Sequence, residues 1–435
     1  MDTLNLICLG LASLGVAQAL LMLVHAYEHR RFHRGRLKAA DKDAFLTSND
    51  PPRVTLFVPC KGVDLELDEH LRALFRQEYG PYELCFIVES ATDPALAVIE
   101  WVRREFLRQP SRVIVAGLAH GCGQKVHNLM RATSVVPHDT EVLAFVDSDA
   151  HPNPLWLRRL VARLQARNVG VSTGYRWYAP VAPTLPNLML SAINALVTNI
   201  MGPHKHNLVW GGSWAIRKST FHELGFPQAW QGAITEDLPI SSRVWNSGLR
   251  VGYEPHCLVT SPADTTWQGM AEFVRRQFLI VRVCLPRCWH AAFWTGVFTN
   301  LALWSAVALT ASWLVSGADW RIPALLTTAI YGLTALRMSI SSAAVRPFLN
   351  TENSVIRRTE RLMTWGWPLI VMGNCLLIAS AGVGQIIVWR GIRYRLESAT
   401  KTVIERRPAP VTPVPQECGA EVMANCTVEP SARAV

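Results

Sequence analysis

Two acidic residues two positions apart, Asp147 and Asp149, have the types and spacing best suited to chemistry in this sequence. They directly follow the apolar run 142–146, which predicts a buried strand. Ligands of open α/β sheets bind beyond the carboxyl ends of the strands, where both carboxylates would lie. Two carboxylates there can hold a divalent cation, which would hold a diphosphate. The alternative is a turn before Pro152 and Pro154.

Charged residues that follow other predicted strands suit a nucleotide. Lys61 follows the first predicted strand, and Glu89 and Asp93 follow the second. A carboxylate at the second strand's tip can accept hydrogen bonds from a uracil or a ribose, although Asp93 can equally cap the next helix. A glycine-rich turn at 121–123 leads into a helix that carries Lys125 and Asn128. Lys125 could neutralise phosphate there, and the alternative is a glycine hinge with a solvated lysine.

Acidic and basic pairs later in the chain have two interpretations each. Glu236 or Asp237 could take the proton from an acceptor hydroxyl, or both could complement the dipole of a helix that starts beside them. Arg276-Gln277, with Arg282 on a nearby turn, could bind a departing diphosphate, or could belong to a basic helix at a membrane surface.

The elements that must position these residues alternate between strand and helix. Strand patterns occur at 54–58, 82–88, 112–116, 141–146 and 169–173, with helix patterns at 64–79 and 94–108 between them. Repeated β-α units predict a mainly parallel sheet with helices on both faces, a Rossmann-like α/β fold. The sequence has neither a G-x-G-x-x-G fingerprint nor a Walker P-loop, so dehydrogenase and ATPase functions lose their usual support.

The ends of the chain predict a membrane protein. Residues 4–27 are long and apolar enough to span a bilayer, and the basic segment 29–36 follows them, which places residue 30 onward in the cytoplasm. Further apolar runs at about 291–316, 322–343 and 366–389 follow. The last run is basic at both ends, so one of the three would be re-entrant or would fold back. The proline-rich end has little apolar patterning and is expected to be disordered.

We therefore expect an anchor at 1–28, a cytoplasmic catalytic domain at 29–290, a membrane region of about three spans at 291–395 and a disordered tail at 396–435. Much of the net charge of +10 lies beside the spans, where it fits membrane topology and anionic lipid. No recognition module accompanies it, so a nucleic-acid partner is not expected. The ten cysteines show no zinc spacing.

In their order along the chain, these motifs resemble membrane-bound family 2 glycosyltransferases, most closely the ceramide glucosyltransferase branch, family 21. The resemblance covers about residues 50–395. The matching stretches are Pro59-x-Lys61-Gly62-Val63-Asp64, Asp93-Pro94-Ala95, Lys125-Val126-x-Asn128-Leu129, Asp147-Ser148-Asp149, Glu236-Asp237 and Trp389-Arg390-Gly391-x-Arg393-Tyr394-Arg395.

The resemblance implies a GT-A fold and an inverting transfer of a hexose from a nucleotide sugar, with UDP-glucose as the expected donor. Asp147 and Asp149 would coordinate Mg or Mn, and Asp237 would be the general base. Lys125 and Glu89 would contact the nucleotide. The acceptor would be the hydroxyl of a membrane lipid such as ceramide or diacylglycerol, with the apolar stretch 185–201 either at its entrance or in the core. The alternatives are a processive polysaccharide synthase and an inactive membrane scaffold.

Two motifs depart from the family pattern. The family's first aspartate falls at or beside Ser90, so Glu89 or Asp93 would replace it. In the family's Q-x-x-R-W motif, Gln277 is followed by Ile280 and Val281 where Arg and Trp are expected. Arg282 is the candidate substitute from a shifted position.

Overall fold

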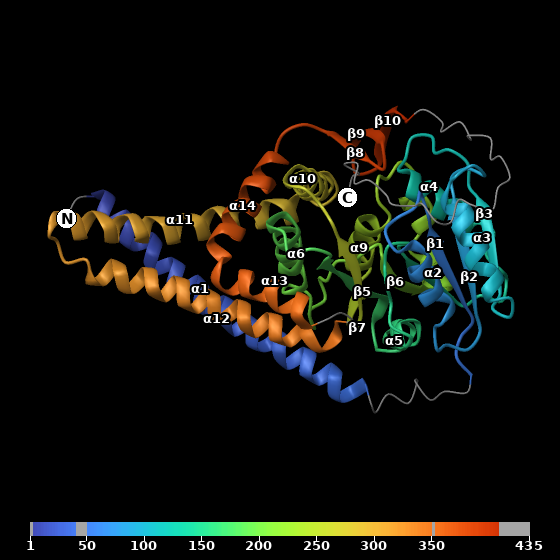
Figure 1. Ribbon diagram of the computed structural model, residues 1–435, viewed down its shortest axis with the longest axis horizontal. Helices are drawn as coiled ribbons and strands as arrows, with labels where there is room; N and C mark the ends of the chain where they lie inside the picture. The colour runs from blue at the N-terminus through green and yellow to red at the C-terminus, as the bar shows by residue number, and fades with distance from the viewer. Residues whose placement is uncertain (1–2, 41–49, 350–352, 409–435) are drawn as a thin grey trace.

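A computed structural model describes residues 3–40, 50–349 and 353–408. Figure 1 shows an α/β domain from which a group of long helices extends to one side. The fold places strands from both halves of the domain side by side in one sheet, so residues far apart in the chain meet at its edge.

The central sheet has seven strands in the order β3-β2-β1-β4-β6-β5-β7. Parallel pairing joins β3, β2, β1 and β4, and also joins β5 to β7, whereas β6 runs antiparallel to both of its neighbours. The expected α/β fold with a mainly parallel sheet is therefore confirmed. The strands are β1 (Val54–Pro59), β2 (Tyr82–Val88), β3 (Ser111–Val115), β4 (Val142–Val146), β5 (Val169–Pro180), β6 (Ser213–Arg217) and β7 (Arg250–Ala263).

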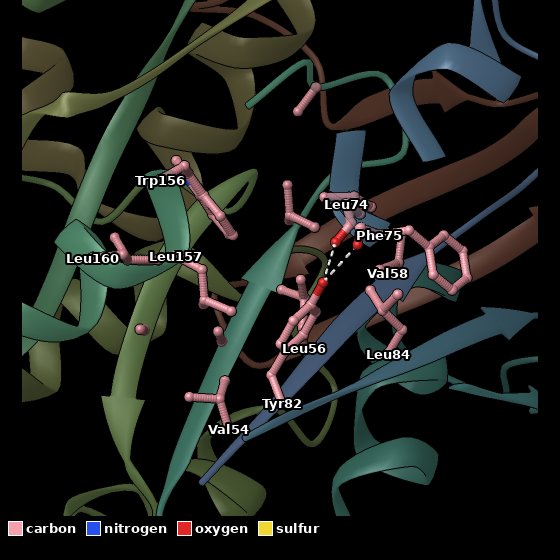
Figure 2. Close-up of a cluster of buried hydrophobic side chains, with 14 of the residues drawn as sticks. Val54, Leu56, Val58, Leu74, Phe75, Tyr82, Leu84, Trp156, Leu157 and Leu160 are labelled. Atoms are coloured by element: carbon pink, nitrogen blue, oxygen red, sulfur yellow. Dashed lines mark hydrogen bonds between the residues drawn. The ribbon is translucent and has the colours of Figure 1, made fainter. Parts of the chain in front are cut away.

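Helices cover both faces of this sheet. On one face, Leu56 and Val58 of β1 pack with Leu74 and Trp156 from two helices (Figure 2). On the other, Phe57 of β1 belongs to a second apolar cluster. The residues of β1 alternate between the two clusters because successive side chains of a strand point to opposite faces. The helices of the domain are α2 (Leu67–Phe75), α3 (Ala95–Glu105), α4 (Gln124–Thr133), α5 (Trp156–Arg163), α6 (Leu185–Thr198), α7 (Lys218–Glu223), α8 (Phe226–Ala229), α9 (Asp237–Asn246) and α10 (Trp267–Cys284).

Three helices among the described residues are long and apolar enough to cross a membrane. They are α1 (Thr3–Ala40), α11 (Pro286–Ser316) and α12 (Arg321–Val345), the last continued by the short 3-10 turn η2 (Arg346–Phe348). The predicted apolar run 366–389 does not form one straight span, because its helix ends at Ser380 and its last residues, Ile386–Trp389, form a strand. A bend of 85° separates α13 (Asn353–Trp365) from α14 (Trp367–Ser380). Pro368 in the first turn of α14 accounts for the break, because proline cannot donate the backbone hydrogen bond that would continue α13.

The chain then leaves the helices and forms a small antiparallel sheet of β8 (Ile386–Trp389), β9 (Ile392–Ser398) and β10 (Lys401–Arg406). The basic cluster expected at the end of a span therefore lies on a hairpin, and strand continues into the segment expected to be disordered. In β9 the buried Ile392, Tyr394 and Leu396 alternate with exposed side chains, the pattern of a half-buried strand. Residues 409–435 of the expected tail lie outside the described residues.

Candidate active site

Charged side chains gather at the carboxyl edge of the sheet. The parallel strands β1, β2 and β4 end together there, so Lys61 after β1, Glu89 after β2 and Asp147 after β4 lie at one edge. Each of these positions was predicted from the sequence, and their convergence follows from the pairing of β1 with both neighbours.

Lys125, in the first turn of α4, lies between two carboxylates. Its Nζ is 2.5 Å from Asp147 Oδ1 and 2.6 Å from Glu236 Oε1. Burial works against its positive charge, but Asp147 and Glu236 outweigh burial and raise the pKa of Lys125 above its ordinary value. Lys125 is therefore charged throughout the neutral range, and it joins the end of β4 to the start of α9.

Arg176 of β5 lies between the two aspartates, and the sequence did not point to it. Its Nη2 is 2.9 Å from Asp147 Oδ2, and its Nη1 is 3.1 Å from Asp149 Oδ2. Its guanidinium also donates to the Tyr178 hydroxyl at 2.7 Å and stacks over the rings of Tyr178 and Trp210. The predicted strand ended at 173, whereas β5 continues to Pro180 along β7 and so carries this arginine into the site.

The pKa values of the two aspartates are shifted in opposite directions. Burial disfavours the charge of Asp147, but Lys125 and Arg176 outweigh burial and hold the pKa of Asp147 below its ordinary value. Burial, together with the charge of Asp147, raises the pKa of Asp149, and the attraction of Arg176 offsets this only in part. A further positive charge beside both groups would stabilise the ionised form of each.

The donor set fits a divalent cation of the magnesium type. Asp147 and Asp149 offer hard carboxylate oxygens, and both converge on one positive centre, the Arg176 guanidinium. Within residues 3–40, 50–349 and 353–408 no three His, Cys, Asp or Glu side chains gather to hold a metal. A cation here would therefore complete its coordination with phosphate and water, as Mg²⁺ commonly does.

Glu236 and Asp237 are neighbours with different environments. Glu236 is buried, and within the described part of the chain its carboxylate has no partner beyond the ion pair with Lys125. Burial, which Lys125 offsets only in part, raises the pKa of Glu236 to about 7. Asp237 is half-buried, and its carboxylate accepts hydrogen bonds from the Thr235 hydroxyl at 2.6 Å and the Gly211 backbone N–H at 3.1 Å. Of the two, Asp237 is the accessible carboxylate.

The backbone at Gly211-Gly212 approaches these carboxylates closely. A Cβ added to Gly211 would lie 2.0 Å from Glu236 Oε1, and one added to Gly212 would lie 2.6 Å from Asp147 Oδ2. Neither position tolerates a side chain without displacing a carboxylate. The acids of the site thus require glycine at both positions.

The remaining predicted residues near the nucleotide position have partners within the protein. Lys61 forms an ion pair with Glu89. Asp93 Oδ1 accepts hydrogen bonds from the backbone N–H groups of Gly62 and Ala95, both at 2.9 Å, so it caps the start of α3 as well as holding the loop after β1. Asn128 is buried and accepts a hydrogen bond from the Gln124 side chain at 2.8 Å.

The basic residues of α10 contact the segment that leads into β8 and β8 itself. Arg276 is buried and donates to the Val388 carbonyl at 3.2 Å, and Arg282 donates to the carbonyls of Gly382 and Gly384. Gln277 is exposed. The charge of Arg276 acts on Tyr178, which contacts Arg176, so this end of α10 faces the cluster around Asp147. Binding of a diphosphate by Arg276, Gln277 and Arg282 stays a prediction.

Arg390 on the C-terminal hairpin also reaches the edge of this cluster. Its Nη1 is 2.5 Å from Asp64 Oδ1 and its Nη2 is 2.8 Å from Asp64 Oδ2. Asp64 in turn accepts a hydrogen bond at 3.4 Å from Ser148, which lies between the two aspartates in the chain. Arg390 and Asp64 both occur in stretches that carried the family resemblance. That resemblance is the signal in the sequence that could have singled them out.

Comparison with known protein families finds a match that covers most of the chain. The model of the family described as glycosyl transferase family 21 matches residues 13–402. Over 107 residues the chain is 32% identical to a ceramide glucosyltransferase of Komagataella phaffii, covering 23% of this chain and 20% of that protein. It is 28% identical over 81 residues to ceramide glucosyltransferase 3 of Caenorhabditis elegans, covering 19% of this chain and 18% of that protein. The chain thus matches about a fifth of the length of these curated relatives.

Among solved structures, the fold is similar to a mannosyltransferase from Pyrobaculum calidifontis in complex with GDP-Man and Mn2+. The TM-score is 0.43 at 15% sequence identity, and the match covers 79% of this chain and 99% of that chain.

Proposed function

The chain belongs to glycosyl transferase family 21, and we propose that it transfers a hexose from a nucleotide sugar to the hydroxyl group of a membrane lipid. UDP-glucose is the proposed donor, and ceramide or diacylglycerol the proposed acceptor. One observation carries the proposal: Asp147 and Asp149 converge on a positive centre at the carboxyl edge of the sheet, where ligands of such sheets bind.

The donor would bind with its diphosphate beside the two aspartates. Asp147 and Asp149 would hold Mg or Mn, which when bound supplies Lewis acidity to the leaving diphosphate. Lys125 keeps Asp147 ionised and adds positive charge close to this position. Lys61 and Glu89, at the tips of the two neighbouring strands, would line the nucleoside side of the site.

Asp237 would act as the general base. It takes the proton of the acceptor hydroxyl while that oxygen forms a bond to the sugar C1 and the C1–oxygen bond to the diphosphate breaks with its electron pair on the nucleotide. Attack from the face opposite the leaving group inverts the anomeric centre. Glu236 is buried against Lys125, so we assign it a positioning role, in which it holds Lys125 and the start of α9 in place.

The position of Asp237 favours an acceptor that arrives from the membrane. Burial, together with the nearby charge of Asp237, raises the pKa of Cys284 to about 12. Cys284 ends α10, and α11, one of the helices able to cross a membrane, begins at Pro286. The base is thus within electrostatic reach of the segment that enters the bilayer. The proposed orientation has the catalytic domain on the cytoplasmic side, and the basic residues at the end of α1 support it by the positive-inside rule.

Helix α6 is the proposed lining of the acceptor path. It is apolar and lies between the sheet and the α13–α14 pair, with contacts to β5, α10, α13 and α14. In Figure 1 it lies on the side of the domain that faces the long helices. Some of its side chains, such as Leu190 and Ala195, are core residues, whereas Leu185 at its start is exposed.

The test is an incubation of membranes that contain the full chain with UDP-sugars, Mg or Mn, and ceramide or diacylglycerol, with lipid products identified by mass spectrometry. Asp149→Ala is the inactive variant, and Arg393→Gln, a surface change on β9, is the matched control. A monohexosyl lipid formed by the wild type and the control but not by Asp149→Ala supports the proposal. Release of UDP with a polymer as product would contradict the lipid acceptor, and no turnover with any donor would contradict the enzyme.

A further inference from the structure

We propose that Arg390 on the C-terminal hairpin binds the outer phosphate of the donor diphosphate, the phosphate that carries the sugar. The inference rests on the proposed function and adds a residue to the donor site. It starts from the small sheet β8–β10, which Figure 1 shows above the α/β domain, near α4 and α10. The hairpin turn of this sheet brings Arg390 to Asp64, a residue 326 positions away in the chain.

The arginines of α10 serve to hold the hairpin. Arg275 donates to the Val383 carbonyl at 2.9 Å, and Arg276 and Arg282 bind carbonyls of Val388 and of the loop before β8. The neighbouring face of α10 is apolar, with Leu279 and Ile280 buried in a cluster that includes Ile387, Ile392 and Leu396 of the small sheet. Helix α10 thus supports the hairpin that carries Arg390.

The turn that carries Arg390 is conformationally costly. Trp389 pairs with Ile392, so Arg390 and Gly391 form a two-residue turn, and both have positive φ, at 50° and 76°. Asn, Asp or Gly usually occupies the first position of such a turn, because a long side chain there is strained. A strained residue persists when other interactions compensate, and here the compensation is the two-pronged contact with Asp64.

Arg390 is more exposed than Lys125 and Arg176 and contacts fewer carboxylates. Lys125 and Arg176 each bridge two carboxylates, and their side chains are only 17% and 11% exposed. Arg390 contacts one carboxylate, and its side chain is 38% exposed. A guanidinium has five N–H donors, so Arg390 can keep a contact with Asp64 and still present donors to a phosphate in two-pronged geometry.

The hairpin is fixed to the donor side of the domain. The Tyr394 hydroxyl accepts a hydrogen bond of 3.2 Å from the backbone N–H of Gln124, the residue before Lys125. After β10, Arg407 donates to the Gln124 side chain at 3.0 Å and to the Ala119 carbonyl at 2.7 Å. The arm that carries Arg390 is therefore tied to the start of α4, which carries Lys125. The charge of Arg390 also acts on both Asp147 and Asp149.

The experiment compares the affinities of UDP and UMP for the purified full chain in lipid nanodiscs, in the presence of Mn2+, by calorimetry. Arg390→Gln should weaken UDP binding about tenfold or more, the usual effect of losing a charge-assisted hydrogen bond, and should change UMP binding by less than about twofold. Arg390→Lys keeps the charge without the fork and should fall between. Arg393→Gln, on the next strand and paired with Glu405, should leave both affinities unchanged.

The ratio of the UDP affinity to the UMP affinity distinguishes phosphate binding by Arg390 from a purely structural role of this residue. If Arg390 serves only to hold the hairpin on Asp64, its loss would weaken UDP and UMP alike, and that result would overturn the inference. Equal UDP affinity in the wild type and Arg390→Gln would also overturn it, while leaving the proposed function intact. Failure of the wild type to bind UDP at all would instead refute the proposed donor, and the inference with it. Should Arg390→Gln fail to fold, Arg390→Lys gives the same decision.

Discussion

The ion pair between Lys125 and Glu236 gives the sharpest test of the site. Asp147 keeps Arg176 as a partner when Lys125 is removed, whereas Glu236, which is 1% exposed, has no other cation in contact among the described residues. Lys125→Met therefore leaves a buried carboxylate without a counter-charge. Breaking one side of a buried ion pair costs about 3–5 kcal/mol, and we expect about 3 kcal/mol here because Glu236 can respond by binding a proton.

The matching double variant should recover much of that loss. Glu236→Gln alone leaves Lys125 paired with Asp147 and should cost about 1 kcal/mol. In Lys125→Met/Glu236→Gln neither buried charge remains, so the two changes should fall short of additivity by about 2 kcal/mol. Lys401→Met breaks an exposed pair with Glu397, in which the lysine side chain is 71% exposed, and should leave the Tm close to that of the wild type.

Thermal unfolding of the wild type and the four variants in nanodiscs measures these effects. For a domain of this size, a loss of about 3 kcal/mol should lower Tm by roughly 6–12 °C. If Lys125→Met were as stable as the wild type, the reasoning would be refuted, because loss of the buried ion pair would then not change the free energy of unfolding. Strict additivity in the double variant would refute it too, because the two residues would not be coupled.

Three further predictions concern the same residues. Asp237→Asn should abolish turnover in the mass-spectrometric assay and leave the UDP affinity within about threefold of the wild type; turnover near the wild-type rate would exclude its role as base. Arg176→Gln removes a cation that occupies the space between the two aspartates, so Mn2+ should raise the Tm of this variant more than that of the wild type, and an equal rise would show that the guanidinium does not compete with the metal. The folded pKa of Glu236, about 7, lies above the unfolded value of 4.5, so the folded state binds the proton more tightly. The contribution of Glu236 to the free energy of unfolding is fully present below pH 4.5 and is lost as the pH rises through about 7. The Tm of Glu236→Gln should therefore rise relative to that of the wild type over this range. A Tm difference that does not change with pH would contradict the pKa shift.

The strands that end at the site were predictable from the sequence. The run Val142–Val146 is apolar at every position, as expected for a strand that is covered on both faces, and its predicted end places Asp147 where the structure has it. The expected bounds of the second strand, 82–88, agree with β2, Tyr82–Val88. These elements depend on short-range patterns of polarity, which a sequence displays directly.

The partners of the acids were not predictable in the same way. Arg176 lies in the second half of β5, where Arg176 pairs with Val259 of β7, and no local pattern marks that pairing. The predicted strand ended at 173, and the next residue, Gly174, approaches the Cys257 carbonyl so closely that a Cβ there would lie 1.9 Å from it. The arginines around Gln277 contact the C-terminal hairpin, and the same hairpin brings Arg390 from the far end of the chain to Asp64.

The sequence by itself determined the periodic and apolar features of this protein: the α/β domain, the acidic tip of β4, the helices able to enter a membrane and the family to which the chain belongs. The tertiary structure alone decided which charges share a site. Lys125 meets Glu236, Arg176 meets Asp149 and Arg390 meets Asp64 only after the sheet has assembled and the C-terminal hairpin has folded back onto α10. Such contacts join residues tens to hundreds of positions apart, and their energies depend on burial that exists only in the folded chain.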